Sequence, residues 1–239
     1  MIPKILHQTW YTNDLTPLLA ERVASTKAQN PDWDYGLWSD ANIEAWLESN
    51  GHTKDLERFR AIRIGPAKAD LWRLIILYYM GGIYMDLDNL FTVPIDEWLE
   101  PDAPCLIMLN KLRRVDFCTA GCEPKNSYVE NTLRTVRERI DKRDDGSALS
   151  VTGPCNWRSS NQENKTRIQL IAGTECEESE AFMSLNNDPR KHCGQLGTPP
   201  RDQWVGKIKF ISTRNRKPWS EVKRPEVNWQ KSRNESLYH

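Results

Sequence analysis

The feature that most constrains this chain is an apolar helix followed by two glycines and a short acidic segment, GGIYMDLD at 81–88. Residues 67–80 are apolar on most faces, which predicts a helix buried against a sheet. The glycines end that helix, and the alternation after them predicts a strand that runs to Asp88. Because strand side chains alternate between faces, Asp86 and Asp88 would lie on one side together with Tyr84.

Two carboxylates that project from one strand end repel each other unless a cation lies between them. Oxygen ligands of this kind suit Mg²⁺ or Mn²⁺, which commonly complete their coordination shells with substrate phosphates. The alternative is that the Asp-x-Asp tripeptide is a solvated turn without a ligand. The tripeptide alone does not separate these interpretations, so its surroundings carry the argument.

Three charged residues, Lys68, Asp70 and Arg73, interrupt the apolar helix. Asp70 and Arg73 are three residues apart and therefore neighbours on one helix face. Burying them is costly unless they are paired. One interpretation is that they simply pair with each other. The other is that both line a polar cleft, with Asp70 accepting from a ribose hydroxyl and Arg73 donating to a phosphate or sugar hydroxyl.

The order of the predicted elements indicates the fold class. Predicted strands alternate with predicted helices, which favours an α/β fold with a mostly parallel central sheet flanked by helices. Thr16 and Pro17 predict one helix start, and Ser39 predicts another. A tight turn is predicted over 150–154. The predicted strands are 4–10, 33–38, 83–88, 91–94, 105–109, 115–120, 168–172 and 207–212, and the predicted helices are 16–29, 40–49, 53–64, 67–80 and 126–141.

The net charge of zero gives no reason to expect a nucleic-acid partner, but the charge is unevenly spread. Residues 1–110 carry 9 basic and 16 acidic side chains, whereas residues 201–239 carry 10 basic and 4 acidic. The basic C-terminal arm could meet a diphosphate or an anionic membrane surface, or it could be a solvated tail.

The first residues are too few and too polar for a signal peptide, and the longest apolar run, 74–80, is far shorter than the ~18 residues that span a bilayer. We therefore expect a cytoplasmic protein without a transmembrane segment, from a bacterium or a virus, with peripheral membrane contact as an option. The six cysteines form no Cys-x-x-Cys pair, and we expect them to be reduced and mostly buried.

Three segments carry a resemblance to a known family: 2–10, supported by 30–33 and 37–38; 69–88; and Thr152-Gly153-Pro154. On these motifs the chain resembles the family 32 glycosyltransferases, which include yeast Och1-type mannosyltransferases and bacterial capsular sugar transferases. It more distantly resembles the glucosyltransferase domains of large clostridial toxins. The resemblance implies one GT-A domain, with residues 1–110 as the nucleotide- and metal-binding half and residues 111–200 as the acceptor and donor-sugar half.

The resemblance also implies roles for residues around the acidic segment. Asp70 would contact the ribose, and Arg73 would reach the diphosphate or the donor sugar. Tyr84 would lie near the phosphates. Asp86 would bind the metal or the donor partly through water, and Asp88 would bind the metal directly.

Further residues are implied outside that segment. His7, Gln8 and Trp10 on the first strand would border the base. Asp116 stands where the family often has an asparagine, so a carboxylate would lie near the donor sugar, or it would be an exposed strand-end acid. Trp219 could close over the diphosphate, although an ordinary packed tryptophan is the alternative.

The activity implied is a Mn²⁺- or Mg²⁺-dependent glycosyltransferase. It would move a sugar from a UDP- or GDP-linked donor to a glycan or glycolipid hydroxyl with retention of configuration. Two other classes stay open. A metal-dependent phosphohydrolase or nucleotidyltransferase would release phosphate or pyrophosphate instead of a nucleoside diphosphate. A non-catalytic carbohydrate-binding protein would use some of the ten tryptophans in an open groove and would need no metal.

Overall fold

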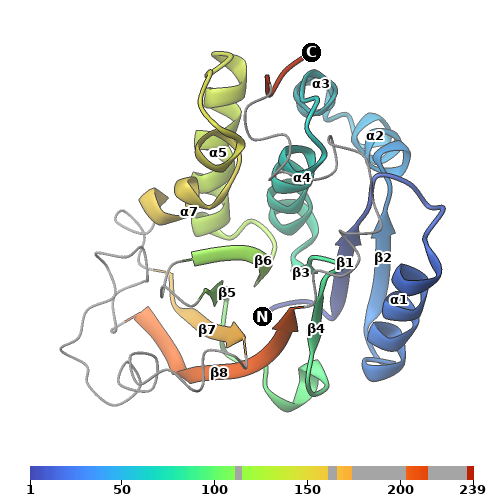
Figure 1. Cartoon of the computed structure of the whole chain (residues 1–239). Helices are drawn as coiled ribbons and strands as arrows, with labels where there is room; N and C mark the ends of the chain where they lie inside the picture. Colours follow the sequence, from blue (N-terminus) through green and yellow to red (C-terminus); the bar gives the residue numbers. More distant parts are fainter. Residues whose placement is uncertain (111–114, 161–165, 174–202, 215–235) are drawn as a thin grey trace.

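The computed structural model describes residues 1–110, 115–160, 166–173, 203–214 and 236–239, and the structural statements below concern these residues. One eight-stranded sheet is flanked by helices (Figure 1). The strands are β1 (Ile5–Thr9), β2 (Asp34–Trp38), β3 (Gly82–Met85), β4 (Asn89–Phe91), β5 (Cys105–Leu109), β6 (Val115–Cys122), β7 (Ile168–Gly173) and β8 (Trp204–Arg214). The helices are α1 (Pro17–Gln29), α2 (Asp40–Ser49), α3 (Thr53–Ala61), α4 (Gly65–Met80), the 3₁₀ turn η1 (Ile95–Glu97), α5 (Ser127–Asp141), α6 (Ala148–Val151) and α7 (Pro154–Ser160).

The strand order is β2-β1-β3-β6-β5-β7-β8-β4. The pairs β1 with β2, β1 with β3, β5 with β7 and β7 with β8 are parallel, whereas β6 runs antiparallel to both β3 and β5. At the far edge β4 pairs antiparallel with β8. The predicted α/β fold with a mostly parallel sheet is confirmed.

The two faces of the sheet bury different clusters of side chains. The larger cluster lies between the sheet and α2 to α5 and α7, and its largest fully buried members include Trp72 and Trp157. The other face packs on the segment around β4 and η1, with Trp33, Phe91 and Trp98. Ile83 and Met85 belong to this second cluster, whereas Tyr84 belongs to the first, so side chains alternate along β3 as predicted.

Side-chain caps explain why two helices begin where the sequence predicted. The Thr16 hydroxyl accepts from the Leu19 N–H at the start of α1, and the Ser39 hydroxyl accepts from the Asn42 N–H at the start of α2. Each bond satisfies one of the N–H groups that a helix start leaves without a partner. These caps fix the starts of the helices that follow β1 and β2.

The glycine pair ends α4 as predicted. Gly81 and Gly82 have φ values of 69° and 93°, a region that favours glycine. A Cβ on Gly82 would collide with the carbonyl oxygen of Ile5, because β3 lies directly against β1 at this point. Two glycines therefore let the chain leave a buried helix and enter the centre of the sheet within two residues.

The predicted strand over 83–88 is too long. β3 ends at Met85, and Asp86 to Asp88 form a turn in which the Asn89 N–H donates to the Asp86 carbonyl over 3.0 Å. The chain then enters β4, which pairs with β8 and not with a neighbour of β3. The argument that Asp86 and Asp88 share a strand face is therefore wrong, because no strand connects them.

The predicted tight turn over 150–154 is confirmed only for its centre, because helices occupy both of its ends. Helix α6 ends at Val151, the chain turns at Thr152 and Gly153, and α7 begins at Pro154. Most of the predicted C-terminal arm lies outside the described residues, although Tyr238 bridges to Ile62 beside α3. In the described part of the chain, every helix is too short or too polar to cross a bilayer.

Candidate active site

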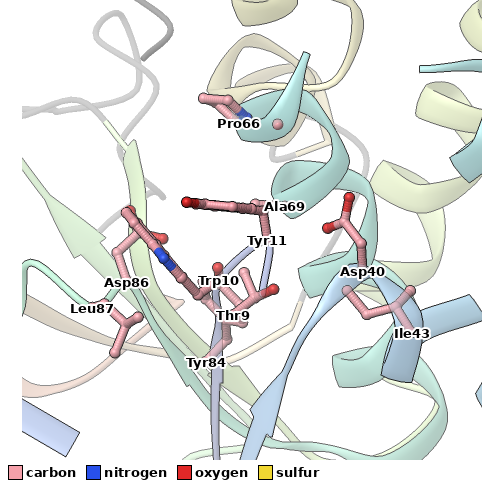
Figure 2. Close-up of a pocket in the computed structure, with 11 residues that line it drawn as sticks. Thr9, Trp10, Tyr11, Asp40, Ile43, Pro66, Ala69, Tyr84, Asp86 and Leu87 are labelled. Atoms are coloured by element: carbon pink, nitrogen blue, oxygen red, sulfur yellow. The ribbon is translucent and has the colours of Figure 1, made fainter. Parts of the chain in front are cut away.

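A cleft opens where β1, β2 and β3 end and α4 begins. The cleft and the open solvent at its mouth together occupy about 530 Å³. Ligands in open α/β sheets commonly bind at the carboxyl ends of the strands. Figure 2 places Asp86 and Leu87 on one side of the cleft and Asp40 and Ile43 on the other, with Tyr11 between them. The cleft is lined by Thr9, Trp10, Tyr11, Asp40, Ile43, Gly65, Pro66, Ala69, Tyr84, Asp86 and Leu87.

A chain of ion pairs connects α4 to the acidic turn. The Arg73 guanidinium bonds Asp70 Oδ1 through Nη1 at 3.1 Å and Asp86 Oδ1 through Nη2 at 3.0 Å. The Arg73 side chain is only 4% exposed, so this arrangement excludes most water. The interpretation that Asp70 and Arg73 pair with each other is thus confirmed. Neither residue is among those that line the cleft, and Arg73 is connected to its edge through Asp86, so their roles toward ribose and phosphate stay predictions.

Tyr84 forms the buried floor beneath this arginine. The Arg73 guanidinium lies 4.5 Å from the centre of the Tyr84 ring, a geometry that stabilises a cation over an aromatic face. Burial, together with the negative charge of Asp86, raises the pKa of Tyr84 well above its ordinary value. Tyr84 is therefore a neutral phenol in this site, and its ring fixes the plane of Arg73.

Asp70 is held from two sides. Arg73 contacts one carboxylate oxygen, and the Thr152 hydroxyl lies 3.3 Å from the other. Burial raises the pKa of Asp70 to about 6, and the nearby Asp116 carboxylate adds to the rise, whereas Arg73 and Thr152 oppose it. Asp116 therefore acts on the Asp70 carboxylate electrostatically, and its own Oδ1 accepts from the Cys118 N–H at 3.2 Å.

The acidic turn offers oxygen donors suited to a hard divalent cation. The Asp86 carboxylate lines the cleft and is 19% exposed, while Asp88, two residues on in the same turn, is 2% exposed. Within the described ranges no group of three or more His, Cys, Asp or Glu side chains is placed to hold a metal. A cation held by these two aspartates would thus take its other ligands from water or from substrate phosphates.

His7 and Gln8 are not where the base-binding prediction requires them. His7 is fully buried, with Nε2 3.0 Å from the Gly81 carbonyl and Nδ1 accepting from Trp38 Nε1 at 3.2 Å. Burial lowers the His7 pKa to about 4, so the ring is neutral and donates through Nε2. Gln8 is 1% exposed and accepts from the Tyr35 hydroxyl. Both are interior residues, and the prediction that they border a ligand is corrected.

The end of β1 does reach the cleft, through Thr9 and the two residues that follow it. Trp10 lines it together with Thr9 and Tyr11, and the role of Trp10 toward a base stays a prediction. The rings of Trp10 and Tyr11 lie 5.5 Å apart. Trp219 lies outside the described residues.

Asp40 is a cleft residue that the sequence did not predict, although the helix start beside it was predicted correctly. Asp40 follows β2 and bonds Lys68 of α4 at 3.0 Å. Burial raises its pKa above the ordinary value. The signal that could have found it is its place one residue beyond the expected helix cap, next to the carboxyl end of a parallel strand.

Comparison with known proteins agrees with this geometry. Residues 18–103 match the family described as "Glycosyltransferase sugar-binding region containing DXD motif". That range contains α4, the glycine pair and the acidic turn with Asp86 and Asp88.

Two curated relatives extend the comparison. The chain is 36% identical over 87 residues to "Inositol phosphoceramide mannosyltransferase 3" of Schizosaccharomyces pombe, which covers 36% of this chain and 24% of the relative. It is 29% identical over 194 residues to "Initiation-specific alpha-1,6-mannosyltransferase" of Candida albicans, covering 64% of this chain and 50% of the relative. The chain thus spans between a quarter and a half of the length of these relatives.

A solved structure shares the fold. The protein described as "PaToxG Glycosyltransferase" superposes with a TM-score of 0.55, at 16% sequence identity, over 99% of this chain and 88% of that one. At this identity the likeness concerns the fold alone. The fold is therefore the GT-A-like arrangement of that glycosyltransferase.

Proposed function

We propose, on the premise that residues 18–103 belong to the DXD-containing sugar-binding region of glycosyltransferases, that this chain is a metal-dependent glycosyltransferase. It transfers a sugar from a UDP- or GDP-linked donor to a hydroxyl of a glycan or glycolipid, with retention of configuration. Mannose is the first sugar to test, because both relatives described above are named mannosyltransferases. The observation that carries the proposal is the Asp70-Arg73-Asp86 chain, which ends at a cleft beside the DXD turn.

The shape of the cleft supports one orientation of the proposed donor nucleotide. Asp86 stands on one side and Asp40 and Ile43 on the other, so a diphosphate at the first side leaves the base at the second. Aromatic faces of Trp10 and Tyr11 lie between and can contact the nucleoside. Asp70 accepts from a ribose hydroxyl in this arrangement.

The charge that develops on the leaving diphosphate is the main target of catalysis. Asp86 and Asp88 would hold the divalent cation, which when bound neutralises that negative charge. Arg73 adds a fixed positive group that stays charged throughout. The bond from the anomeric carbon to the phosphate oxygen breaks, a bond to the acceptor oxygen forms on the same face, and the acceptor proton passes to the leaving phosphate. This route needs no protein nucleophile.

A donor screen tests the proposed function. The chain would be incubated with UDP-glucose, UDP-galactose, UDP-N-acetylglucosamine and GDP-mannose, each with Mn²⁺, with Mg²⁺ and with EDTA. We expect metal-dependent release of UDP or GDP from one donor. Release of inorganic phosphate or pyrophosphate would instead support a hydrolase or nucleotidyltransferase, and sugar binding without any turnover would support a carbohydrate-binding protein.

The raised pKa of Asp70 predicts a pH dependence of nucleotide binding. Because the carboxyl takes up a proton as the pH falls through about 6, its capacity to accept from ribose and to pair with Arg73 is lost at acid pH. Affinity for UDP or GDP should therefore fall roughly tenfold between pH 7 and pH 5, measured by calorimetry. Nucleotide phosphates titrate in the same range, so the Asp70→Asn variant supplies the baseline. An identical pH profile in that variant would contradict the prediction.

The same shift has a consequence for stability with the opposite sign. The folded protein retains a proton on Asp70 that the unfolded chain releases near the ordinary value of 3.8. The contribution of Asp70 to the free energy of unfolding therefore falls as the pH rises from about 4 to about 6. Nucleotide affinity is therefore expected to rise with pH while the contribution of Asp70 to the free energy of unfolding falls.

A further inference from the structure

Thr152 contacts Asp70 from a segment that does not line the cleft. It follows α6, is fully buried, and lies 82 positions along the chain from Asp70. Its hydroxyl oxygen is 3.3 Å from Asp70 Oδ2 and 3.0 Å from the Ala148 carbonyl oxygen. A threonine hydroxyl has one proton, so it donates to one of these two acceptors at a time.

Backbone hydrogen bonds indicate which of the two acceptors the hydroxyl donates to. The Ala148 carbonyl already accepts from the N–H groups of Thr152 at 3.0 Å and Gly153 at 2.9 Å. A carbonyl oxygen has two lone pairs, and both are engaged by these bonds. The carboxylate of Asp70 is the stronger acceptor because it carries charge. The Thr152 hydroxyl therefore donates its hydrogen bond to Asp70 Oδ2.

We propose that Thr152 is a positioning residue for Asp70: its hydroxyl fixes one carboxylate oxygen while Arg73 fixes the other, so that the carboxylate keeps the orientation in which it accepts from the donor ribose. This inference rests on the proposed function. With the Thr152 hydrogen bond, a chain of polar contacts connects four residues, from Thr152 through Asp70 and Arg73 to Asp86.

The charged groups around Asp70 explain why its protonation depends on the Thr152 hydroxyl. Burial and the Asp116 carboxylate on β6 favour the protonated form of Asp70, whereas Arg73 on α4 and the Thr152 hydroxyl oppose it. Valine has nearly the shape of threonine but no hydroxyl. The Thr152→Val variant would leave Asp70 Oδ2 without this donor, so the carboxylate would turn more freely and bind a proton more tightly.

The test uses three variants of the full chain. Thr152→Val removes the hydroxyl, and Thr152→Ser keeps it. Thr132→Val is the matched control, because Thr132 in α5 is equally buried and donates to the carbonyl four residues earlier, that of Tyr128, at 2.9 Å. Calorimetry measures the binding of UDP and of GDP in the presence of Mn²⁺. Carbon-13 NMR of the aspartate carboxyls measures the pKa of Asp70.

We expect Thr152→Val to bind the nucleotide roughly tenfold more weakly and to show a higher Asp70 pKa, while Thr152→Ser and Thr132→Val stay within about twofold of the parent. Unchanged affinity and unchanged pKa in Thr152→Val would overturn the inference, as would a serine variant that fails to restore them. If the parent chain binds neither UDP nor GDP, the proposed function fails. The Asp70 pKa in Thr152→Val then decides the role of Thr152 alone: a rise supports it, and no rise overturns it.

Discussion

Replacement of Asp86 by asparagine is expected to lower sugar transfer by about 10³-fold while the fold is retained. The substitution keeps the size of the side chain but removes the negative charge at the edge of the cleft. A divalent cation contributes several kcal/mol to stabilising the leaving diphosphate, and each 1.4 kcal/mol corresponds to about tenfold in rate. The fold should persist because Arg73 keeps its ion pair with Asp70.

The measurement is metal-dependent release of the nucleoside diphosphate, together with Mn²⁺ affinity by electron paramagnetic resonance and thermal unfolding by circular dichroism. Asp32→Asn is the matched control, because it removes an exposed carboxylate from the turn before β2. That control should keep the parent activity. Near-parent, metal-dependent turnover in Asp86→Asn would show that the metal site is assigned to the wrong residue.

Replacement of Gly82 by alanine is expected to destabilise the fold by at least about 3 kcal/mol. Two effects add here. Its φ of 93° is strained for any residue with a Cβ, and the new methyl group would overlap the Ile5 carbonyl oxygen and come within 3.2 Å of His7 Nε2. Both obstacles belong to β1, whose pairing with β3 positions the acidic turn, so the backbone cannot shift away without opening the sheet centre.

Gly51→Ala separates the two effects. Gly51 also has a positive φ, 72°, but an added Cβ there would meet no atom within 4 Å. This variant should lose about 1 kcal/mol, from backbone strain alone. Urea unfolding of the two variants gives the difference. Equal losses of unfolding free energy in the two variants would mean that β3 does not approach β1 closely enough at Gly82 for a methyl group to clash.

Local signals in the sequence predicted most of the elements. Thr16 and Ser39 supply caps whose hydrogen bonds do not depend on the rest of the fold, and Gly81 supplies the helix end. The alternation along β3 gave the correct faces as far as Met85. These features are decided within a few residues, which is why a linear pattern was sufficient.

The acidic turn could not be predicted in the same way. The pattern of alternation continues through Leu87 and Asp88, yet the chain leaves the sheet centre after Met85. The cause is the pairing of β4 with β8, a strand more than 100 positions later, as in the pair of Asn89 with Arg214. Such long-range pairing overrides a local periodicity and leaves no sign in it.

The candidate site was predicted in its centre and only partly at its edges. Asp70, Arg73, Tyr84 and Asp86 lie together as the motif spacing implied. His7 and Gln8, predicted to border a base, are both buried within β1, and the cleft is lined instead by Thr9, Trp10 and Tyr11 at the end of that strand. The sequence pattern did not show that both faces of β1 are covered as far as Gln8. Thr152 was recognised as part of a motif, but its contact with Asp70 depends on how α6 packs beside α4.

A crystal structure with Mn²⁺ and UDP or GDP tests the central claim most directly. Anomalous scattering would locate the cation independently of the protein atoms. We predict one manganese ion bound by carboxylate oxygens of Asp86 and Asp88 and by both phosphates of the nucleotide, with the ribose near Asp70. A nucleotide bound in this cleft without a metal, or manganese bound elsewhere with the two aspartates turned away, would contradict the account.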